Sequence, residues 1–294
     1  MDFALIAFGL GVGVLVGMTG IGGGSLMTPM LILVFGVTPV TAIGSDLAYA
    51  AVTKTVGGYK HLRQHTVDVR LSSWMAIGSV PAAVTGVYVL HLLEDWAGRD
   101  FDDLLITILA CALLLTGAAT LVRSFLKGMT ARERDTIPME RRHKIAAVVM
   151  GACVGFVLGV TSAGSGALIA VGLILFFRLS PQRVVGTDVF HAAILLWAAG
   201  LAHVSAGNVD FGLVGTILIG SIPGVWVGSH WSVRVDPAVL RGTLAIVLIG
   251  AGLALLIKAG LDIPLGVIAP FPVAVMVLLV VTMARARRAR EQVR

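Results

Sequence analysis

The sequence carries little charge. Asp, Glu, Lys and Arg make up 13% of its 294 residues, whereas a soluble globular protein carries about 25%. So small a share cannot cover the surface of a water-soluble chain of this length, which excludes a soluble enzyme. Hydrophobic residues make up 57% of the chain, which excludes a disordered one. These two shares together indicate a protein that lies in a membrane.

Cysteine is nearly absent. The two cysteines, Cys111 and Cys153, lie in apolar segments, and neither has a second cysteine or a histidine at the spacing of a metal site. We therefore expect both to act as small apolar side chains. No metal site, cofactor or catalytic residue is predicted, and no enzyme motif is present.

Long apolar runs are abundant. A helix needs about 20 apolar residues to cross the roughly 30 Å hydrocarbon core of a bilayer, and most of the runs reach this length. Two runs, 25–36 and 166–178, are too short, and both follow glycine-rich breaks. The sequence thus predicts an all-α polytopic membrane protein with two broken helical segments.

The chain also repeats itself. Sliding it by 142 residues aligns the two halves without a gap from Gly9 and Gly151 to Gly86 and Gly228. The matched positions include polar and special residues as well as apolar ones. They are Thr19/Thr161, Gly22/Gly164, Gly24/Gly166, Pro39/Pro181, Gly44/Gly186, Asp46/Asp188, His61/His203 and Asp68/Asp210. We therefore predict two copies of one transmembrane unit.

The repeat divides the chain into four parts. We predict a first transmembrane repeat at 1–126, a basic cytoplasmic linker at 127–144, a second repeat at 145–258, and a final helix with a basic cytoplasmic tail at 259–294. The positive-inside rule explains these basic stretches. The net charge of +6 therefore gives no reason to expect a nucleic-acid partner.

The glycine-rich breaks allow two topologies. If each break is the tip of a re-entrant hairpin, each repeat has five helical elements and the two repeats are inverted, with the N-terminus outside and the C-terminus in the cytoplasm. If each break is a kink in one spanning helix, the repeats are parallel and the five-arginine tail falls outside. The positive-inside rule favours the inverted repeats, and only Lys258 falls on the wrong side.

The two breaks, 18–25 (MTGIGGGS) and 160–166 (VTSAGSG), are the first candidate site. Irregular backbone at membrane depth must line a cavity or be packed in protein. The helix that follows each break presents free N–H groups and a positive dipole end, which suit an anion. A tight turn that only permits packing is the alternative. The predicted substrate-binding residues are Thr19, Gly22, Gly23, Gly24, Ser25, Thr161, Ser162, Gly164, Ser165 and Gly166.

Lys54 is a further substrate-binding candidate. It lies inside an apolar run, and its repeat partner is Leu196, so the repeat does not require the charge. One role is to attract an anion. The alternative is that the side chain snorkels toward the cytoplasmic surface.

Four ionisable residues are candidates for coupling or gating. Asp46 and Asp188 follow Gly-Ser and Gly-Thr at matched positions, and a carboxylate near a membrane is a functional candidate. A helix N-cap is the other role that this pattern allows. His61 and His203 also match, and they suit either a paired protonation site or an interfacial cap of a helix C-terminus.

Several motifs together point to a family. They are 20–25 (GIGGGS), Pro29, 39–46 (PVTAIGSD), His61, 67–68 (VD), 78–81 (GSVP), 185–188 (VGTD) and 220–224 (GSIPG). As a set they resemble the sulfite exporter TauE/SafE family, over about residues 5–257. The resemblance implies a bacterial inner-membrane permease that exports small sulfur-containing anions such as sulfite or organosulfonates.

We therefore expect a secondary transporter with alternating access, in which one repeat rocks against the other. The chain has no ATP-binding motif, so an ion or substrate gradient must supply the energy, with H⁺ or Na⁺ as the coupling ion. The expected partners are the anion and the lipid bilayer, and no oligomeric state is predicted. The alternatives are an anion channel, an intramembrane enzyme and a cation or metal permease.

Overall fold

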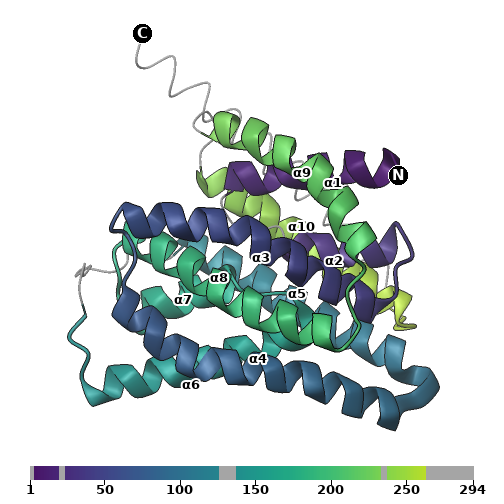
Figure 1. Cartoon of the computed structure of the whole chain (residues 1–294), viewed down its shortest axis with the longest axis horizontal. Helices are drawn as coiled ribbons and strands as arrows, with labels where there is room; N and C mark the ends of the chain where they lie inside the picture. The colour runs from purple at the N-terminus through teal and green to yellow at the C-terminus, as the bar shows by residue number, and fades with distance from the viewer. Residues whose placement is uncertain (1–2, 20–23, 126–136, 233–236, 263–294) are drawn as a thin grey trace.

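The fold is helical. A computed structural model describes residues 3–19, 24–125, 137–232 and 237–262, and Figure 1 shows the chain. In these ranges the elements are ten α-helices and one short 3-10 helix. Four helical stretches there are long and apolar enough to cross a bilayer, namely Val69–Leu121, Arg141–Thr161, Pro181–Ser205 and Phe211–His230. The prediction of an all-α polytopic membrane protein is confirmed.

Each half of the chain contains five α-helices in its described residues. The first half has α1 (Phe3–Thr19), α2 (Gly24–Leu33), α3 (Pro39–Arg63), α4 (Val69–Ala97), the 3-10 helix η1 (Gly98–Asp100) and α5 (Phe101–Phe125). The second half has α6 (Arg141–Thr161), α7 (Ala167–Leu175), α8 (Pro181–Ser205), α9 (Phe211–Ser232) and α10 (Pro237–Lys258). The order of long and short helices is the same in both halves, as the repeat predicts.

The second helix of each half is too short to cross. α2 has 10 residues and α7 has 9, which at 1.5 Å per residue spans about half of the hydrocarbon core. Each follows the glycine-rich break and precedes a long helix that begins with a proline at its first position, Pro39 or Pro181. This is the helix pattern expected of a re-entrant hairpin.

Glycine lets the backbones of the two halves touch. In α1, Gly9, Gly13 and Gly17 face the backbone of α9, and in α6, Gly151, Gly155 and Gly159 face that of α4. The four-residue spacing puts the glycines of each helix on one face, so two helices approach closely, as in small-xxx-small packing. Both pairs run parallel, and each joins a helix of one half to a helix of the other.

Equivalent helices of the two halves cross antiparallel. Gly44 of α3 faces Asn208 beyond the end of α8, and Gly186 of α8 faces Thr66 beyond the end of α3. In the same way Gly117 of α5 faces Ala245 of α10. Inverted repeats require such antiparallel crossings, and the inversion itself stays a prediction. The orientation of the repeats in the membrane stays a prediction.

Lys258, the one exception to the charge rule, has a specific partner. Its ammonium nitrogen donates to the carbonyl oxygen of Ile32 at 2.7 Å. This carbonyl belongs to the last turn of α2, where helix carbonyls lack intrahelical donors and a cation is favourable. The lysine therefore caps a short helix rather than setting the topology.

Two of the predicted parts of the chain lie largely outside the residues that the structure describes. The final helix and basic tail lie at 263–294, beyond the described residues, apart from the first few residues of the predicted 259–294 segment. Much of the predicted linker, 126–136, is also outside them. α6 begins at Arg141, so its first turn includes the basic end of that linker.

Candidate functional site

The second break forms a sharp tip between α6 and α7. Ser162 ends α6 with a left-handed backbone (φ 59°), and its N–H donates to the carbonyl oxygen of Leu158 at 2.8 Å. Gly164 follows with φ +100°. A left-handed conformation is uncommon for a residue with a side chain, and such conformations gather at functional sites. α6 therefore ends at this tip and α7 begins as a separate helix, while the re-entrant hairpin stays a prediction.

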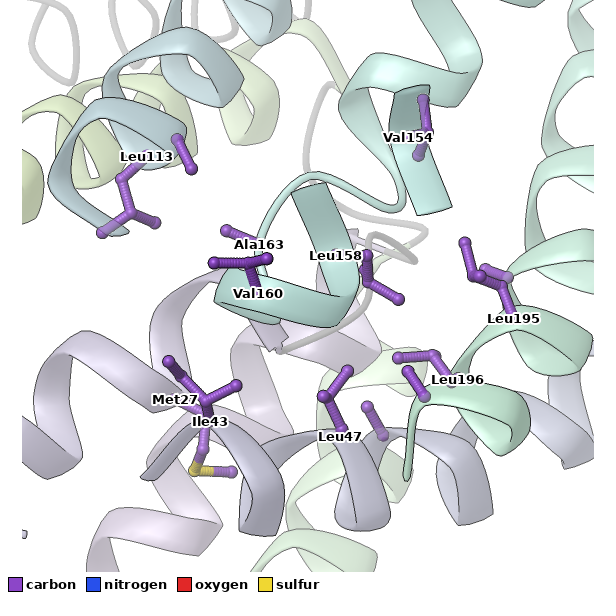
Figure 2. Close-up of a cluster of buried hydrophobic side chains, with 14 of the residues drawn as sticks. Met27, Ile43, Leu47, Leu113, Val154, Leu158, Val160, Ala163, Leu195 and Leu196 are labelled. Carbon is purple, nitrogen blue, oxygen red and sulfur yellow. The ribbon is translucent and has the colours of Figure 1, made fainter. Parts of the chain in front are cut away.

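This tip is packed inside the protein. Thr161 is 1% exposed, Ser162 2% and Ala163 1%. Figure 2 shows Val160 and Ala163 in one buried hydrophobic cluster with Leu113 of α5 and Met27 of α2. Irregular backbone at membrane depth requires such cover, because lipid offers it no hydrogen-bond partners.

Three polar side chains meet at the tip. The Thr28 hydroxyl of α2 donates to Oδ2 of Asp46 at 2.6 Å, and it also lies 2.6 Å from the hydroxyl oxygen of Ser162. All three residues are buried, and Asp46 is 1% exposed. A chain of hydrogen bonds thus joins the second tip to a buried carboxyl group on α3.

The same contact brings the second tip to the first short helix. Thr28 follows Gly24, the first residue of α2, by about one helical turn, which is roughly 6 Å along the axis. The second tip therefore contacts the first turn after the first break. Thr19 is the last residue of α1, and Gly22 and Gly23 lie outside the described residues.

The remaining residues of the predicted substrate site differ in their surroundings. The Thr161 hydroxyl donates to the carbonyl oxygen of Val157 at 2.6 Å, so its hydrogen is engaged within α6. Ser25 is buried near the start of α2. Ser165 and Gly166 precede the first residue of α7, Gly166 as its N-cap, and the first N–H groups of a helix have no intrahelical acceptor. These first N–H groups of α7 are the donors that can bind a ligand at the tip.

The N-cap interpretation of the two aspartates is wrong. The N-cap residues are Thr38 for α3 and Ser180 for α8, and Asp46 and Asp188 each lie about two turns inside their helices. Sequence analysis placed the starts of these helices too late because Pro39 and Pro181 were not used as first helical residues. Asp188 is also buried, at 5% exposure.

The residue before each aspartate links the two halves. The Ser45 hydroxyl oxygen accepts from the backbone N–H of Asp210 at 3.0 Å, and that of Thr187 accepts from the N–H of Asp68 at 2.9 Å. Asp68 and Asp210 cap α4 and α9 through bonds from Leu71 and Leu213. In the Gly-Ser/Thr-Asp motif, the glycine leaves room for the loop of the other half. The Ser or Thr hydroxyl accepts a hydrogen bond from that loop.

The two matched histidines hold loops. His203 is fully buried, with Nε2 2.9 Å from the carbonyl oxygen of Gly159 and Nδ1 3.2 Å from the side-chain amide of Asn208. Because a carbonyl can only accept, Nε2 carries the hydrogen and Nδ1 accepts. Nδ1 of His61 lies 3.0 Å from the hydroxyl of Thr66. These contacts favour the capping alternative over gating, which stays a prediction.

Lys54 lies away from the tip along α3. It is buried at 6% exposure and follows Asp46 by eight residues, which is about 12 Å of helix. Burial of the side chain does not fit snorkelling to the surface. Its role in attracting an anion stays a prediction.

Three buried polar residues are absent from the candidates that the repeat predicts. Thr28 is one, because its repeat partner is Ala170. His191, which is fully buried, lies with Nε2 3.2 Å from the Ser79 hydroxyl. Its repeat partner is Tyr49, also buried. A search for identical pairs overlooks such positions, whereas a search for polar residues inside apolar runs would have found them.

Comparison with known proteins decides the family. The family model of the sulfite exporter TauE/SafE matches residues 5–255. The chain belongs to the sulfite exporter TauE/SafE family. It is 38% identical over 257 residues to "Probable membrane transporter protein YjnA" of Bacillus subtilis (strain 168), which covers 87% of this chain and all of the relative.

Other relatives extend the TauE/SafE match. "Probable membrane transporter protein YdhB" of the same organism is 28% identical, over 83% of this chain and 96% of its own length. "Sulfite exporter TauE/SafE family protein 3" of Arabidopsis thaliana is 30% identical, over 42% of this chain and 25% of its own length. No solved structure matches. The TauE/SafE family and these relatives are named for membrane transport, and the chain is a transmembrane transporter of that family.

Proposed function

We propose that the chain is a secondary transporter that exports small sulfur-containing anions, such as sulfite or organosulfonates, across the bacterial inner membrane by alternating access. The observation that carries this proposal is the contact between Thr28 and Ser162. It joins the start of one short helix to the tip that precedes the other. Secondary transporters built from repeats bind their substrates where such half-helices meet.

The chemistry of this meeting point suits an anion. α2 and α7 both begin beside it, so two sets of N–H groups and two positive dipole ends are available. Hydroxyl groups of Ser162 and Thr28 add polar contacts. Such a site attracts an anion without a formal positive charge, and Lys54 would add one farther along α3.

Alternating access needs units that move, and the packing favours mixed units over whole repeats. α1 is held against α9, and α4 against α6, by backbone contacts at glycines. Each pair combines one helix from each half. We therefore infer that the rocking units contain helices of both repeats, and that one repeat does not move as a body against the other.

The test is exchange of labelled sulfite in proteoliposomes, with taurine, sulfoacetate and thiosulfate in parallel. A carrier gives saturable exchange that unlabelled anion on the far side accelerates. A channel gives flux without saturation, and an intramembrane enzyme converts the label chemically. Absence of exchange for all four anions would overturn the proposed substrate class.

A matched pair of variants tests the site. Ser162→Ala should raise the half-saturation concentration roughly tenfold or more, because a hydrogen bond to a charged ligand is lost. Ser73→Ala removes an exposed hydroxyl that bonds only within its own helix, to Val69, and should leave exchange unchanged. Equal exchange in both variants would place the anion elsewhere.

A further inference from the structure

The hydrogen bonds that join Asp46, Thr28 and Ser162 can do more than hold an anion: they can couple it to a proton. We propose that Asp46 binds one proton with each anion carried, and that Thr28 transmits the protonation of Asp46 to the hydroxyl group of Ser162. The proposal rests on the proposed function, because the proton is transported together with the anion. It gives the tip a specific coupling ion and a specific direction of coupling.

The geometry brings the three groups together. The Thr28 hydroxyl contacts both other groups, 2.6 Å from Oδ2 of Asp46 and 2.6 Å from the Ser162 hydroxyl oxygen. Both distances are short for bonds between oxygen atoms. The Ser162 hydroxyl and the Thr28 backbone N–H also lie close to the Asp46 carboxyl group. The second carboxyl oxygen of Asp46, Oδ1, is buried and has no hydrogen-bond partner among the described residues. It is an open acceptor position on the same carboxyl group.

Counting hydrogens gives the state with ionised Asp46. A carboxylate only accepts, and each hydroxyl has one hydrogen. Thr28 must therefore donate its hydrogen to Asp46. Ser162 then donates its hydrogen to Thr28 or to the carboxylate beside it. In this state the hydrogen of Ser162 is engaged, and its hydroxyl oxygen presents only lone pairs, which repel an anion.

Protonation of Asp46 reverses the direction in which these three side chains donate their hydrogen bonds. With the proton on Oδ2, the carboxylic acid donates to the Thr28 oxygen, and Thr28 then donates to Ser162. The hydrogen of Ser162 is released and points to a ligand at the tip, while the negative charge of Asp46 is removed. Both changes favour an anion at the tip, so proton binding and anion binding strengthen each other, and by linkage the effect is reciprocal.

The other groups near Asp46 do not replace this chain. From α3 itself, Tyr49 lies one turn away and Lys54 two turns away; from α9, Ser221 lies near Tyr49. From α2 and from the tip come Thr28 and Ser162. Figure 2 shows that Met27, Leu47 and Ala163, which neighbour the three members of the chain in sequence, belong to a buried hydrophobic cluster. Water is therefore a poor competitor for these hydrogen bonds.

The second half cannot build the same relay. The repeat partners of Thr28 and Ser162 are Ala170 and Gly20, and neither has a hydroxyl group. The relay that we propose for Asp46 therefore has no counterpart at the matched positions of the second half.

One proton per anion sets the driving force. Net transport then follows the product of the anion and proton gradients. Export requires an internal anion pool that outweighs an inward proton gradient, and a low internal pool allows uptake by the same route.

The test uses the full chain in proteoliposomes with equal pH on both sides. Half-saturation of sulfite exchange is measured over a series of pH values for wild type, Asp46→Asn, Thr28→Val, Thr28→Ser and Asp188→Asn. Every variant meets the same mixture of sulfite species at each pH, so the ratio between variants isolates the protein. Asparagine donates a hydrogen to Thr28 at every pH and imitates protonated Asp46.

Relative to Asp46→Asn, wild type should lose affinity with rising pH, by up to about tenfold for each pH unit, as one linked proton requires. Thr28→Ser, which keeps the hydroxyl, and Asp188→Asn, whatever its rate, should behave like wild type. Thr28→Val should reduce the pH dependence to the part that comes from the charge of Asp46 alone, although Asp46 is intact. A purely structural role of Thr28 would leave the pH profile unchanged.

A second measurement uses a pH difference across the vesicle membrane. Wild type should accumulate sulfite on the alkaline side against its gradient, while Asp46→Asn exchanges sulfite without accumulation. If wild type and both relay variants, Asp46→Asn and Thr28→Val, share one pH profile, the relay is overturned while the anion carrier stands. If wild type exchanges none of the tested anions, the proposed function falls and this inference with it.

Discussion

Thr28 and Ser162 come from different halves of the chain, yet their hydroxyl oxygens lie 2.6 Å apart inside the protein. One belongs to the first short helix, and the other forms the tip that precedes the second. The second tip and the first short helix are therefore in contact, as the proposed site requires. Asp46, bound to the same threonine, adds an ionisable group to it.

Helix packing at glycine predicts a sharp contrast between two neighbouring positions. A Cβ atom at Gly13 would collide with the backbone of Ser221, whereas one at Gly11 meets nothing within 4 Å. Gly13→Ala should therefore lower the free energy of unfolding in detergent by about 2 kcal/mol or more, since α1 and α9 must separate. Gly11→Ala should leave it unchanged or raise it slightly. Equal melting temperatures for both variants would contradict the close packing of α1 and α9.

Inverted repeats predict opposite labelling of equivalent loops. In a background with Cys111 and Cys153 replaced by alanine, Gln64→Cys follows α3 and Ser205→Cys ends α8; both positions are exposed. A membrane-impermeant thiol reagent added outside intact cells should label Ser205→Cys only. Gln64→Cys should react only after the cells are opened. Labelling of both from the same side would show parallel repeats.

The hydrogen bond from the Asp68 N–H to the Thr187 hydroxyl joins the two halves. We therefore expect position 187 to need a hydroxyl group for full stability. Thr187→Val leaves the backbone N–H of Asp68 without its partner at 2.9 Å, and an unpaired buried donor costs about 1–3 kcal/mol. Thr187→Ser keeps the hydroxyl and should be close to wild type. Chemical denaturation in detergent measures the difference. A Thr187→Val protein as stable as Thr187→Ser would mean that this bond contributes nothing.

His203 is expected to matter for stability and not for pH response. His203→Ala removes the bonds to Gly159 and Asn208 and leaves a cavity in a buried site, so the unfolding free energy should fall by about 2–4 kcal/mol. The pH profile of sulfite exchange by the folded fraction should follow wild type. A flattened profile in this variant would restore His203 as a gating residue.

The sequence predicted much of the fold. Hydropathy marked the helices and the two short runs, and the repeat of 142 residues gave five elements in each half. These features follow from local patterns, because the length of an apolar run and the position of glycines decide which segments can cross a bilayer. The family also follows from the sequence, since its motifs extend over both halves.

The candidate site depended on the tertiary structure. Nothing in the neighbourhood of Thr28 in the sequence indicates Ser162, and the repeat alignment pairs Thr28 with an alanine. The role of Ser45 as a link to Asp210 was equally invisible, because its partner is a backbone N–H in the other half. The starts of α3 and α8 decided that the aspartates are not N-caps.

The sequence by itself determined the membrane class, the helical elements, the repeat and the family, because each of these is written in residues that lie close together along the chain. Only the tertiary structure decided which hydroxyl groups meet Asp46, and that the second tip contacts the first short helix. The physical reason is that these contacts form between halves whose relative placement depends on glycine packing along α1, α4, α6 and α9, and the pairing of distant backbones has no local signal.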